Sequence, residues 1–440
     1  MNKNRTIKGF SKLNKRGKIK WIVENFFKDP ESVMHELVSY WHGSEEQQKV
    51  LDGFSENTIS NFHMPFSVAP NFVINDTAFV VPMVIEESSV VAAASSAAKF
   101  WMNRGGIQSE VISTTKVGQI HLTCLQDFII LNKWFNTHKQ TIISSLSQHT
   151  ESMEARGGGI LNTDIFEFEE EENYFQIRME FETCDSMGAN FINTILEAAA
   201  KEIVNLHQTT YGEDSHLQIL MCILSNYTPD CLVRATVSCT IEELGKVAGL
   251  SALQFAHRFA KAVRIAEIDP YRATTHNKGI FNGVDSVVLA TGNDFRAVES
   301  CGHTYAARDG QYRSLSHCEV TDTHFKFWLE MPMALGTVGG LTKLHPIAKR
   351  SIEMLGNPSA KELMQITAAV GLAQNFAAVK SLVTTGIQKG HMKMHLSNVL
   401  NQLKATEAEF RIAVDHFKDK VVSHKSVREF LENLRTQGSI

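Results

Sequence analysis

Apolar and polar positions alternate with two different periods along the chain, and the change of period divides it into parts. Between residues 10 and 52, apolar and charged positions recur at helical spacing, which predicts two or three helices. A region punctuated by prolines follows and predicts extended chain. The alanine-rich residues 90–101 then predict a close-packed helix capped by Ser88 or Ser89.

From about residue 117 the period changes to two, which is typical of strands in a half-exposed sheet. The predicted order is strand 119–125, helix 131–155, strand 165–168, strand 174–182, helix 190–208 and strand 217–224. This order matches a ferredoxin-like split βαβ unit. We interpret it as a domain inserted into a larger one.

The larger domain resumes near Asn226, and capping boxes at 240–243, 359–362 and 426–429 predict helix starts. The last part of roughly 55 residues is too small and polar to bury a core alone, so we expect it to dock on the rest. The fold class is α+β: a large mixed substrate domain, an inserted ferredoxin-like cofactor domain and a helical C-terminal flap. The expected ranges are 1–114 and 226–384 for the large domain, 115–225 for the insert and 385–440 for the flap.

Composition narrows the class of protein. The 440 residues are 43% hydrophobic and 21% charged, which is ordinary for a soluble globular protein of two or three domains. A net charge of −5 without a basic stripe gives no reason to expect a nucleic-acid partner. No apolar run approaches the roughly 18 residues of a membrane span, and the basic N-terminus lacks the apolar core of a secretory signal. Seven scattered cysteines fit a reducing, cytoplasmic location.

Residues 269–294 hold the densest group of chemically useful side chains. Five polar residues fall within eleven positions: Arg272, His276, Asn277, Lys278 and Asn282. The apolar run 287–290 predicts a short buried strand that brings Asp294 back toward them. A charged surface loop is the alternative, but the two glycines near the lysine, Gly279 and Gly283, and an aspartate returned by a strand favour a placed Lys278–Asp294 pair.

Two further residues are candidates for proton transfer. Glu87 lies just ahead of a predicted helix, where a carboxylate that complements the helix dipole is the commoner case. His391, in GIQKGHMKMH, is a candidate general acid near neutral pH, although an exposed or capping histidine is also possible. His391 and His395 have the i, i+4 spacing of a metal pair. With no glutamate between them and no third ligand, we expect no metal.

Glycine-bounded loops are the candidates for nucleotide binding. The loop 185–190 precedes a predicted helix, where backbone N–H groups can hold a pyrophosphate. Glycine at a helix boundary is more often only a stop signal. The chain contains neither a GxGxxG after a strand nor a GxxxxGK[ST], so any nucleotide site is not of the Rossmann or P-loop type.

Together these stretches resemble hydroxymethylglutaryl-coenzyme A (HMG-CoA) reductase, and more closely its soluble bacterial class II. The resemblance runs from about residue 56 to about residue 395. Eight motifs occur in the family's order: ENTIS, VPMVIEESSVVAAAS, DSMGAN, DPYRATTHNKGIFNG, ATGND, TVGGLTKLHP, GLAQN and KGHM.

The resemblance implies a role for each matching position. The residues that match the catalytic set are Glu87, Lys278, Asp294 and His391. Those at positions that contact or order the hydroxymethylglutaryl group are Ser89, Arg272, Asn282, Gln374 and Asn375. Those at the dinucleotide site are Asp185, Met187, Gly188, Asn190 and Asn226.

The implied reaction is the four-electron reduction of HMG-CoA to mevalonate and CoA with two NAD(P)H, or its reverse. An ammonium such as Lys278 next to Asp294 offsets the oxyanion left by each hydride. Glu87 can supply a proton, and His391 can protonate the CoA thiolate. No metal is required. Family members build the site across a dimer interface, so at least a homodimer is expected.

One departure bears on the cofactor. Thr150 stands seven residues before Gly157, where NADH-dependent relatives hold an aspartate that repels a 2′-phosphate. A neutral residue there predicts a preference for NADPH over NADH.

Two competing functions use the same residues. A CoA-thioester aldolase or lyase would use Lys278 as a Schiff-base nucleophile. A catalytically silent CoA- or nucleotide-binding regulator is the other, and the intact catalytic set argues against it.

Overall fold

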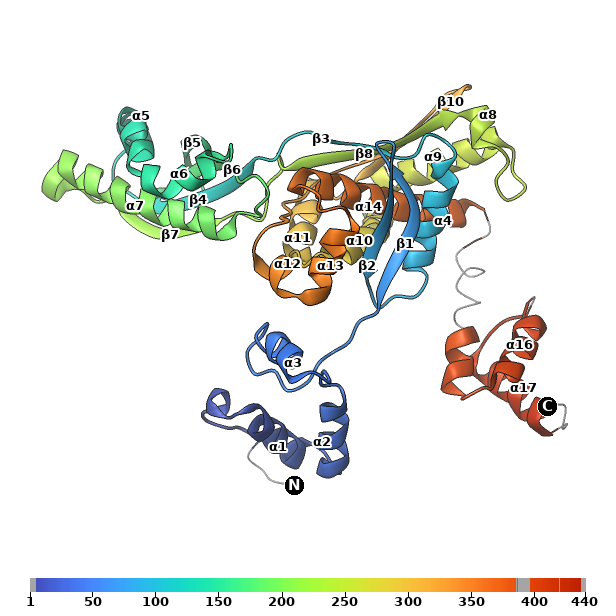
Figure 1. Ribbon diagram of the computed structural model, residues 1–440. Coiled ribbons are helices and arrows are strands. Elements are labelled where there is room, and N and C mark those ends of the chain that lie inside the picture. The colour runs from blue at the N-terminus through green and yellow to red at the C-terminus, as the bar shows by residue number, and fades with distance from the viewer. Residues whose placement is uncertain (1–4, 385, 387–395, 419, 437–440) are drawn as a thin grey trace.

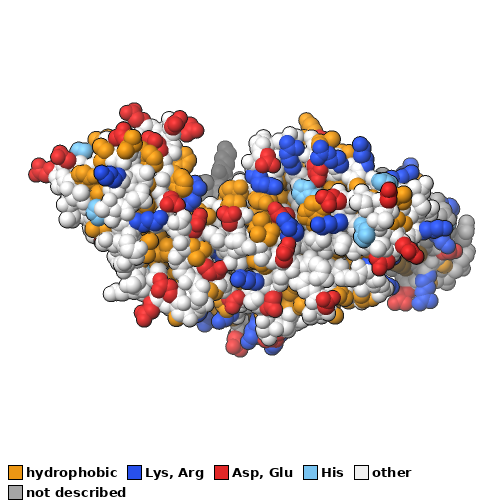
Figure 2. Space-filling model, turned by 90° about the horizontal axis from the view of Figure 1, so that it is seen from above, with side chains coloured by type: hydrophobic (Ala, Val, Ile, Leu, Met, Phe, Trp, Pro, Cys, Tyr) orange, Lys and Arg blue, Asp and Glu red, His pale blue; other side chains and the backbone are white. Residues whose placement is uncertain are grey.

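The computed structural model describes residues 5–384, 386, 396–418 and 420–436. Its largest part is a body of helices packed on an antiparallel sheet, and a smaller α/β lobe extends from one end of that body (Figure 1). Seen from above, the lobe and the body lie side by side (Figure 2). The mixed helix and sheet content confirms the α+β class.

The sheet of the body has four strands in the order β3-β8-β10-β9. Their bounds are Gln108–Val111 for β3, Leu232–Thr240 for β8, Ser316–Val320 for β9 and His324–Pro332 for β10. Every pair is antiparallel, and Trp328 of β10 lies between Thr236 of β8 and His317 of β9. Buried positions alternate along β8 and β10, because one face of the sheet packs against helices.

Helix α14 forms the centre of the body. The helices of this core are α4 (Val90–Met102), α9 (Ala252–Ile268), α10 (Pro270–Ala290), α11 (Phe295–Ala306) and α14 (Ala360–Val383). Of the described helices, α14 is long and apolar enough to cross a membrane by length and composition, but 67% of its apolar window is buried. A helix that is hydrophobic all round is expected at the centre of a large core. The Ser359 capping box that predicts its start is present.

Smaller elements complete the body. The hairpin of β1 (Phe66–Ile74) and β2 (Thr77–Val84) turns at Asn75 and Asp76, which both have positive φ. Three short helices are α8 (Ile241–Leu244), α12 (Gly340–Leu344) and α13 (Pro346–Met354). The predicted capping box at Thr240 is present, although the helix it opens is only four residues long.

The lobe has the predicted strand and helix order. Its elements are β4 (Lys116–Thr123), α5 (Phe128–Ser145), α6 (Ser147–Glu154), β5 (Gly159–Glu167), β6 (Tyr174–Glu182), α7 (Ala189–Tyr211) and β7 (Gln218–Leu224). The sheet order β5-β6-β4-β7, all antiparallel, is the ferredoxin-like arrangement. The helices bury their own apolar cluster against one face of this sheet. The exact domain boundaries stay a prediction.

Helical segments at both ends lie apart from the body (Figure 1). At the N-terminus these are η1 (Phe10–Lys12), α1 (Lys15–Phe26), α2 (Pro30–Ser39) and α3 (Glu45–Asp52); at the C-terminus, α16 (Glu407–His416) and α17 (His424–Thr436). The expectation that the C-terminal part buries no core of its own is wrong. Its helices bury a cluster that includes Leu400, Phe417 and Leu431.

Two local predictions are also wrong. Residues 287–290 are the last turn of α10 and not a strand. Val287 and Val288 continue the helical spacing of Ile280 and Val284, and a short apolar run cannot by itself distinguish a buried helix from a strand. Ser426 does not cap a helix, because α17 begins two residues earlier and the hydroxyl of Ser423 accepts from the Ser426 N–H.

Candidate active site

An ion pair between two segments that are far apart in sequence marks the candidate site. Lys278 Nζ lies 2.7 Å from Glu87 Oε2, and Asn282 Nδ2 lies 3.5 Å from the same oxygen. Lys278 and Asn282 stand one helical turn apart on α10, and Glu87 follows β2, which packs against that helix. The Lys278 and Glu87 side chains are 60% and 37% exposed, so the pair faces solvent.

The backbone around Glu87 holds an unusual conformation. Ser89, which begins α4, has a φ of 81°, a left-handed conformation that costs a non-glycine residue energy. Its side chain makes no cap hydrogen bond, so the prediction of a serine side-chain cap is not confirmed at this position. The backbone instead starts the helix, because the Ala93 N–H donates to the Ser89 carbonyl.

Helix α10 is well formed although its sequence is dense in polar residues. Asp269 accepts from the Tyr271 N–H as the N-cap, and Pro270 occupies the first turn, where its missing N–H costs nothing. The helix passes very close to α14 at Gly283, where an added Cβ would lie 2.8 Å from the Val370 carbonyl oxygen and 2.9 Å from Gln374 Cβ. This close crossing brings Gln374 next to Gly283, the residue after Asn282.

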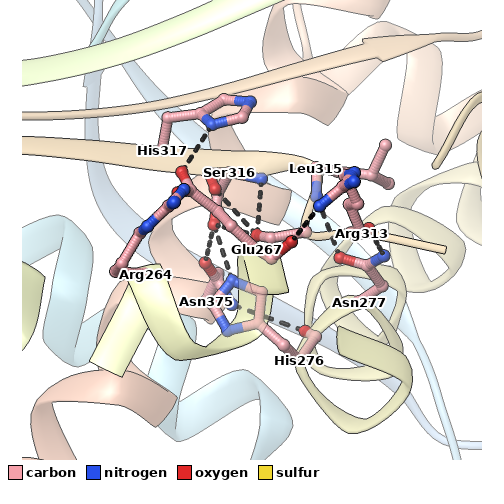
Figure 3. A network of polar contacts seen from close by, with 10 residues as sticks. Arg264, Glu267, His276, Asn277, Arg313, Leu315, Ser316, His317 and Asn375 are labelled. Carbon is pink, nitrogen blue, oxygen red and sulfur yellow. Dashed lines mark hydrogen bonds and ion pairs between the residues drawn. The ribbon is translucent and has the colours of Figure 1, made fainter. Parts of the chain in front are cut away.

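A buried polar network holds His276 and Asn277, the two residues before Lys278 (Figure 3). His276 Nε2 is 2.6 Å from Ser316 Oγ, and Ser316 Oγ donates to Asn375 Oδ1 at 2.8 Å. Because the serine proton goes to the amide oxygen, Nε2 of His276 carries the hydrogen that it donates. Burial, with smaller contributions from Arg272 and His317, lowers the pKa of His276 to about 3, so the ring stays neutral.

Asn277, the next residue of α10, is also held by hydrogen bonds. Asn277 Nδ2 donates to the Arg313 carbonyl at 2.8 Å, and Asn277 Oδ1 accepts from the Leu315 N–H at 3.0 Å. His276 and Asn277 therefore connect two consecutive positions of the helix to residues 313–316, where β9 begins (Figure 3). The next residue, Lys278, is held on the outer face of the same turn.

Asp294 does not join this group within one chain. After Lys278 the helix continues for twelve residues, which is roughly 18 Å along its axis at 1.5 Å per residue. Asp294 then caps α11: its carboxylate accepts from the Arg296 and Ala297 N–H groups and pairs with the Arg296 guanidinium at 2.8 Å. The expected Lys278–Asp294 contact is therefore absent from the single chain as described.

The other predicted residues near this site lie in different surroundings. Arg272 is half-buried on α10, two turns before Lys278, and burial lowers its pKa. Gln374 is buried on α14 and its Oε1 has no hydrogen-bond partner among the described residues. Such a buried acceptor requires a donor from water or a ligand. His391 and His395 lie outside the described residues.

The predicted cofactor loop joins the lobe to the body. Asp185 Oδ1 accepts from the Ala360 N–H at the start of α14, and the Asp185 carbonyl accepts from the Thr337 N–H. Gly188, with a φ of 95°, begins the 23-residue helix α7, and no side chain caps that helix. Its first N–H groups are thus available to an anion, as predicted from the motif. Asn190 follows on the exposed side of the first turn.

A hollow lies where the lobe meets the body. Met187 and Asn226 line it together with Lys116, Ser225 and Thr228. Sequence reasoning missed Lys116, which is only 3% exposed and whose ammonium has no hydrogen bond or ion pair to any described residue. A lysine at the start of a strand was the available signal, because lysine is almost never buried without a partner.

Thr150 must be corrected from a contact residue to a core residue. It is 3% exposed, and its hydroxyl is directed at the Ser147 carbonyl within α6. Arg156 on this side is exposed, and its carbonyl accepts from Cys184 Sγ, one residue before Asp185. Within the described ranges, no three His, Cys, Asp or Glu side chains group as metal ligands.

Comparison with known proteins gives one consistent family. The model of the family described as hydroxymethylglutaryl-coenzyme A reductase matches residues 19–396. A 3-hydroxy-3-methylglutaryl-coenzyme A reductase of Archaeoglobus fulgidus is 36% identical over 390 residues, 88% of this chain and 86% of that protein. A probable reductase of Borreliella burgdorferi is 31% identical over 94% of this chain and 89% of its own.

Solved structures agree with this result. The class II reductase of Streptococcus pneumoniae, bound to NADPH in open conformations, superimposes with a TM-score of 0.72 and 36% identity over 93% of this chain and all of that one. A second structure of the reductase from the same organism has a TM-score of 0.72 and 34% identity over 98% of this chain.

Proposed function

Because this chain belongs to the hydroxymethylglutaryl-coenzyme A reductase family, in its class II, we propose that Glu87, Lys278, Asp294 and His391 carry its reaction. That reaction is the NAD(P)H-dependent reduction of HMG-CoA to mevalonate and CoA. The observation that supports the assignment is the 2.7 Å contact between Lys278 and Glu87. An exposed ion pair contributes only about 0–1 kcal/mol to stability, so folding alone gives little reason to place these charges together.

Lys278 provides the positive charge that the chemistry needs. A bound reduced dinucleotide supplies a hydride twice, and each transfer leaves a negative oxygen on the substrate. The ammonium of Lys278, held on a rigid helix above the His276 and Asn277 anchors, lies where it can stabilise that oxygen. The same group would polarise the carbonyl before each transfer.

Glu87 and His391 move the protons. The Glu87 carboxyl, in contact with Lys278, can pass a proton to the oxyanion that completes the alcohol. We assign His391 to protonation of the CoA thiolate, which prevents its return to the aldehyde. Two hydrides, which carry four electrons, and two protons then balance the conversion of the thioester to an alcohol and a free thiol.

The substrate group would be held by polar side chains around this pair. Asn282 lies beside Glu87, and Gln374 lies beside Gly283 with an unpaired amide oxygen. That oxygen is suited to accept from the substrate hydroxyl. We keep Ser89, Arg272 and Asn375 in this set: Arg272 as the cation for the substrate carboxylate, and Asn375 as an amide oriented by Ser316.

The residues at the junction of the lobe and the body suit a dinucleotide. The N-terminus of α7 at Gly188 offers backbone N–H groups and a favourable dipole for a pyrophosphate. Asn226 and the buried Lys116 line the neighbouring hollow, where an unpaired ammonium can donate to a polar group of the bound cofactor. We accordingly assign residues 115–225 as the dinucleotide-binding domain and 385–440 as the flap.

We propose NADPH as the preferred cofactor, with Arg156 rather than Thr150 as the residue that favours it. Arg156 is exposed next to the cofactor loop, and a guanidinium can pair with the 2′-phosphate that distinguishes NADPH from NADH. Thr150 contributes to this preference only because it is not a carboxylate, which would repel the 2′-phosphate.

A comparison of the two cofactors tests this proposal. Initial rates of HMG-CoA-dependent oxidation should favour NADPH in the wild-type protein, and R156A should reduce that preference by roughly tenfold, about the value of one exposed charge-assisted bond. R178A, an arginine on β6 that stacks on Phe166, is the control. A tenfold preference of the wild-type protein for NADH would contradict the cofactor assignment, whereas no HMG-CoA-dependent oxidation with either cofactor would contradict the function.

We also propose that the complete site forms between two copies of the chain in the cytoplasm. Asp294 is separated from Lys278 by most of α10 within one chain, so a second copy is the source of an aspartate that could approach the lysine. A homodimer, or a multiple of dimers, follows from this requirement.

A further inference from the structure

Two acidic residues face each other where α10 packs against α11. These helices run antiparallel: Gly302 of α11 packs against the Phe281 ring of α10, and one turn away Asp285 hydrogen-bonds Glu299. Asp285 Oδ1 is buried and accepts no hydrogen bond from an N–H or O–H donor of the described residues. Nothing in the mechanism above uses this pair.

The position of the pair relates it to the site. Residues 278, 282 and 285 form one stripe along α10, since positions four and seven residues apart lie on the same helix face. Lys278 and Asn282 of this stripe contact Glu87, and Asp285 is the next polar group along it. On the other helix, Glu299 lies five residues after Asp294, the residue that caps α11.

Two carboxyl groups in hydrogen-bonding contact cannot both be ionised away from water. Burial first, and then Glu299, raise the pKa of Asp285 to about 9, so the pair retains one proton at neutral pH. Because the two groups titrate together, the proton belongs to the pair and not to one residue. A protonated carboxyl that donates to a carboxylate is a strong, charge-assisted hydrogen bond.

The surroundings offer no other charge to the pair. The elements packed against α10 are α4, α9, α11, α13, α14 and β2. Of their titratable groups, only Glu299 contributes to the shift of the Asp285 pKa. His303, one turn after Glu299, has its pKa lowered by burial and bonds Tyr312, so it is neutral and supplies no counter-charge.

We propose that Asp285 and Glu299 share a single proton, and that this bond is a positioning element that keeps α10, with Lys278 and Asn282, in register with α11, which begins at Asp294. Loss of the proton would place two negative charges in contact and push the helices apart. The expected effect on turnover rests on the proposed roles of Lys278 and Asp294. The presence of the shared proton does not depend on those roles.

Infrared spectroscopy tests the shared proton directly. The wild-type protein at pH 7 should show the C=O stretch of a protonated carboxyl that is missing in both D285N and E299Q. The same band should disappear as the pH rises through about 9. If the wild-type spectrum at pH 7 contains no band that both variants lack, the pair is fully ionised and the proposal is wrong.

Thermal unfolding gives a second readout with a definite sign. In the unfolded chain Asp285 loses its proton near 3.8, whereas in the fold it keeps it to about 9, so stability falls as the pH rises across this range. D285N has no such group. The melting temperature of the wild-type protein should therefore fall relative to that of D285N between about pH 5 and pH 9, and an unchanged difference would contradict the proposal.

Activity separates positioning from a merely structural role. D285A should lower kcat by roughly tenfold or more through misplaced groups, and D285N, which still donates to Glu299, should restore it. D285N should also retain activity at alkaline pH where the wild type loses it. If the activity of D285N declines at alkaline pH as that of the wild type does, the Asp285–Glu299 bond does not position the site. If K278A remains active while the carboxyl band persists, the proposed function fails and the shared proton stands.

Discussion

At the scale of the residue, the contrast between neighbours on one helical turn explains how the site is held. His276 and Asn277 are fully buried and hydrogen-bonded, and Lys278 beside them is exposed. The buried pair fixes the rotation of α10 about its axis, so the lysine has one direction in which to point. The rigidity of the site thus comes from side chains that never reach the substrate.

Replacing Lys278 by alanine should lower kcat by about 100-fold or more, because one stabilising group for the oxyanion is lost. The free energy of unfolding should change by no more than about 1 kcal/mol, since the ion pair with Glu87 is exposed. Steady-state kinetics and denaturant unfolding measure the two effects. K99A, an exposed lysine on α4, is the control and should leave both unchanged. Normal turnover in K278A would rule out the mechanism.

At the scale of the element, the crossing of α10 and α14 sets the geometry of the substrate side. The two helices approach closely because Gly283 has no side chain, and the approach places Gln374 beside Gly283. Residues 269–294 look like a polar loop followed by a strand, because charged and amide side chains interrupt the apolar stripe. In the structure residues 270–290 form one helix whose apolar stripe faces α14 and whose polar stripe faces Glu87.

Two glycines of the same helix allow a matched comparison. G283A should destabilise the protein by about 1–3 kcal/mol, because the added methyl would lie 2.8 Å from the Val370 carbonyl oxygen. G279A has no atom within 4 Å of its added methyl and should be stabilising by up to about 1 kcal/mol through helix propensity. Chemical denaturation measures both. Equal effects would show that the helix crossing is looser than described.

At the scale of the whole molecule, the proposed catalytic set is divided. Glu87 and Lys278 meet on the body, the dinucleotide loop lies where the lobe joins it, and Asp294 caps a different helix. Lys278 lies in the first half of α10 and Asp294 lies four residues beyond the end of that helix, so on our proposal the two residues would meet only between copies of the chain. The proposed assembly would then be part of the active site and not only a means of gaining stability.

Mixing two inactive variants tests this arrangement. K278A and D294A homodimers should each be inactive. After the subunits exchange at equal concentrations, half of the dimers are mixed and each has one complete site, so about a quarter of wild-type activity should return. A K278A/D294A double variant mixed with an otherwise inactive K278A chain is the control and should restore nothing. No recovery in the first mixture, with exchange confirmed by mass, would place both residues in one chain's site.

The sequence by itself determined the class of fold, the order of the lobe and the identities of the chemical groups. Period-two alternation from residue 117 is a local property, because each strand must bury every second side chain against its own sheet. The Ser359 capping box is equally local and marks the start of α14 correctly. The motif DPYRATTHNKGIFNG likewise identified Lys278, which the structure places against Glu87.

Only the tertiary structure decided the secondary structure of residues 287–290, the burial of Thr150 and Lys116, and the separation of Asp294 from Lys278. Each depends on packing between segments distant in sequence. A short apolar run becomes helix or strand according to its partner, and a threonine or lysine is buried according to what covers it. Whether two charges meet within one chain depends on the length and direction of the helix between them.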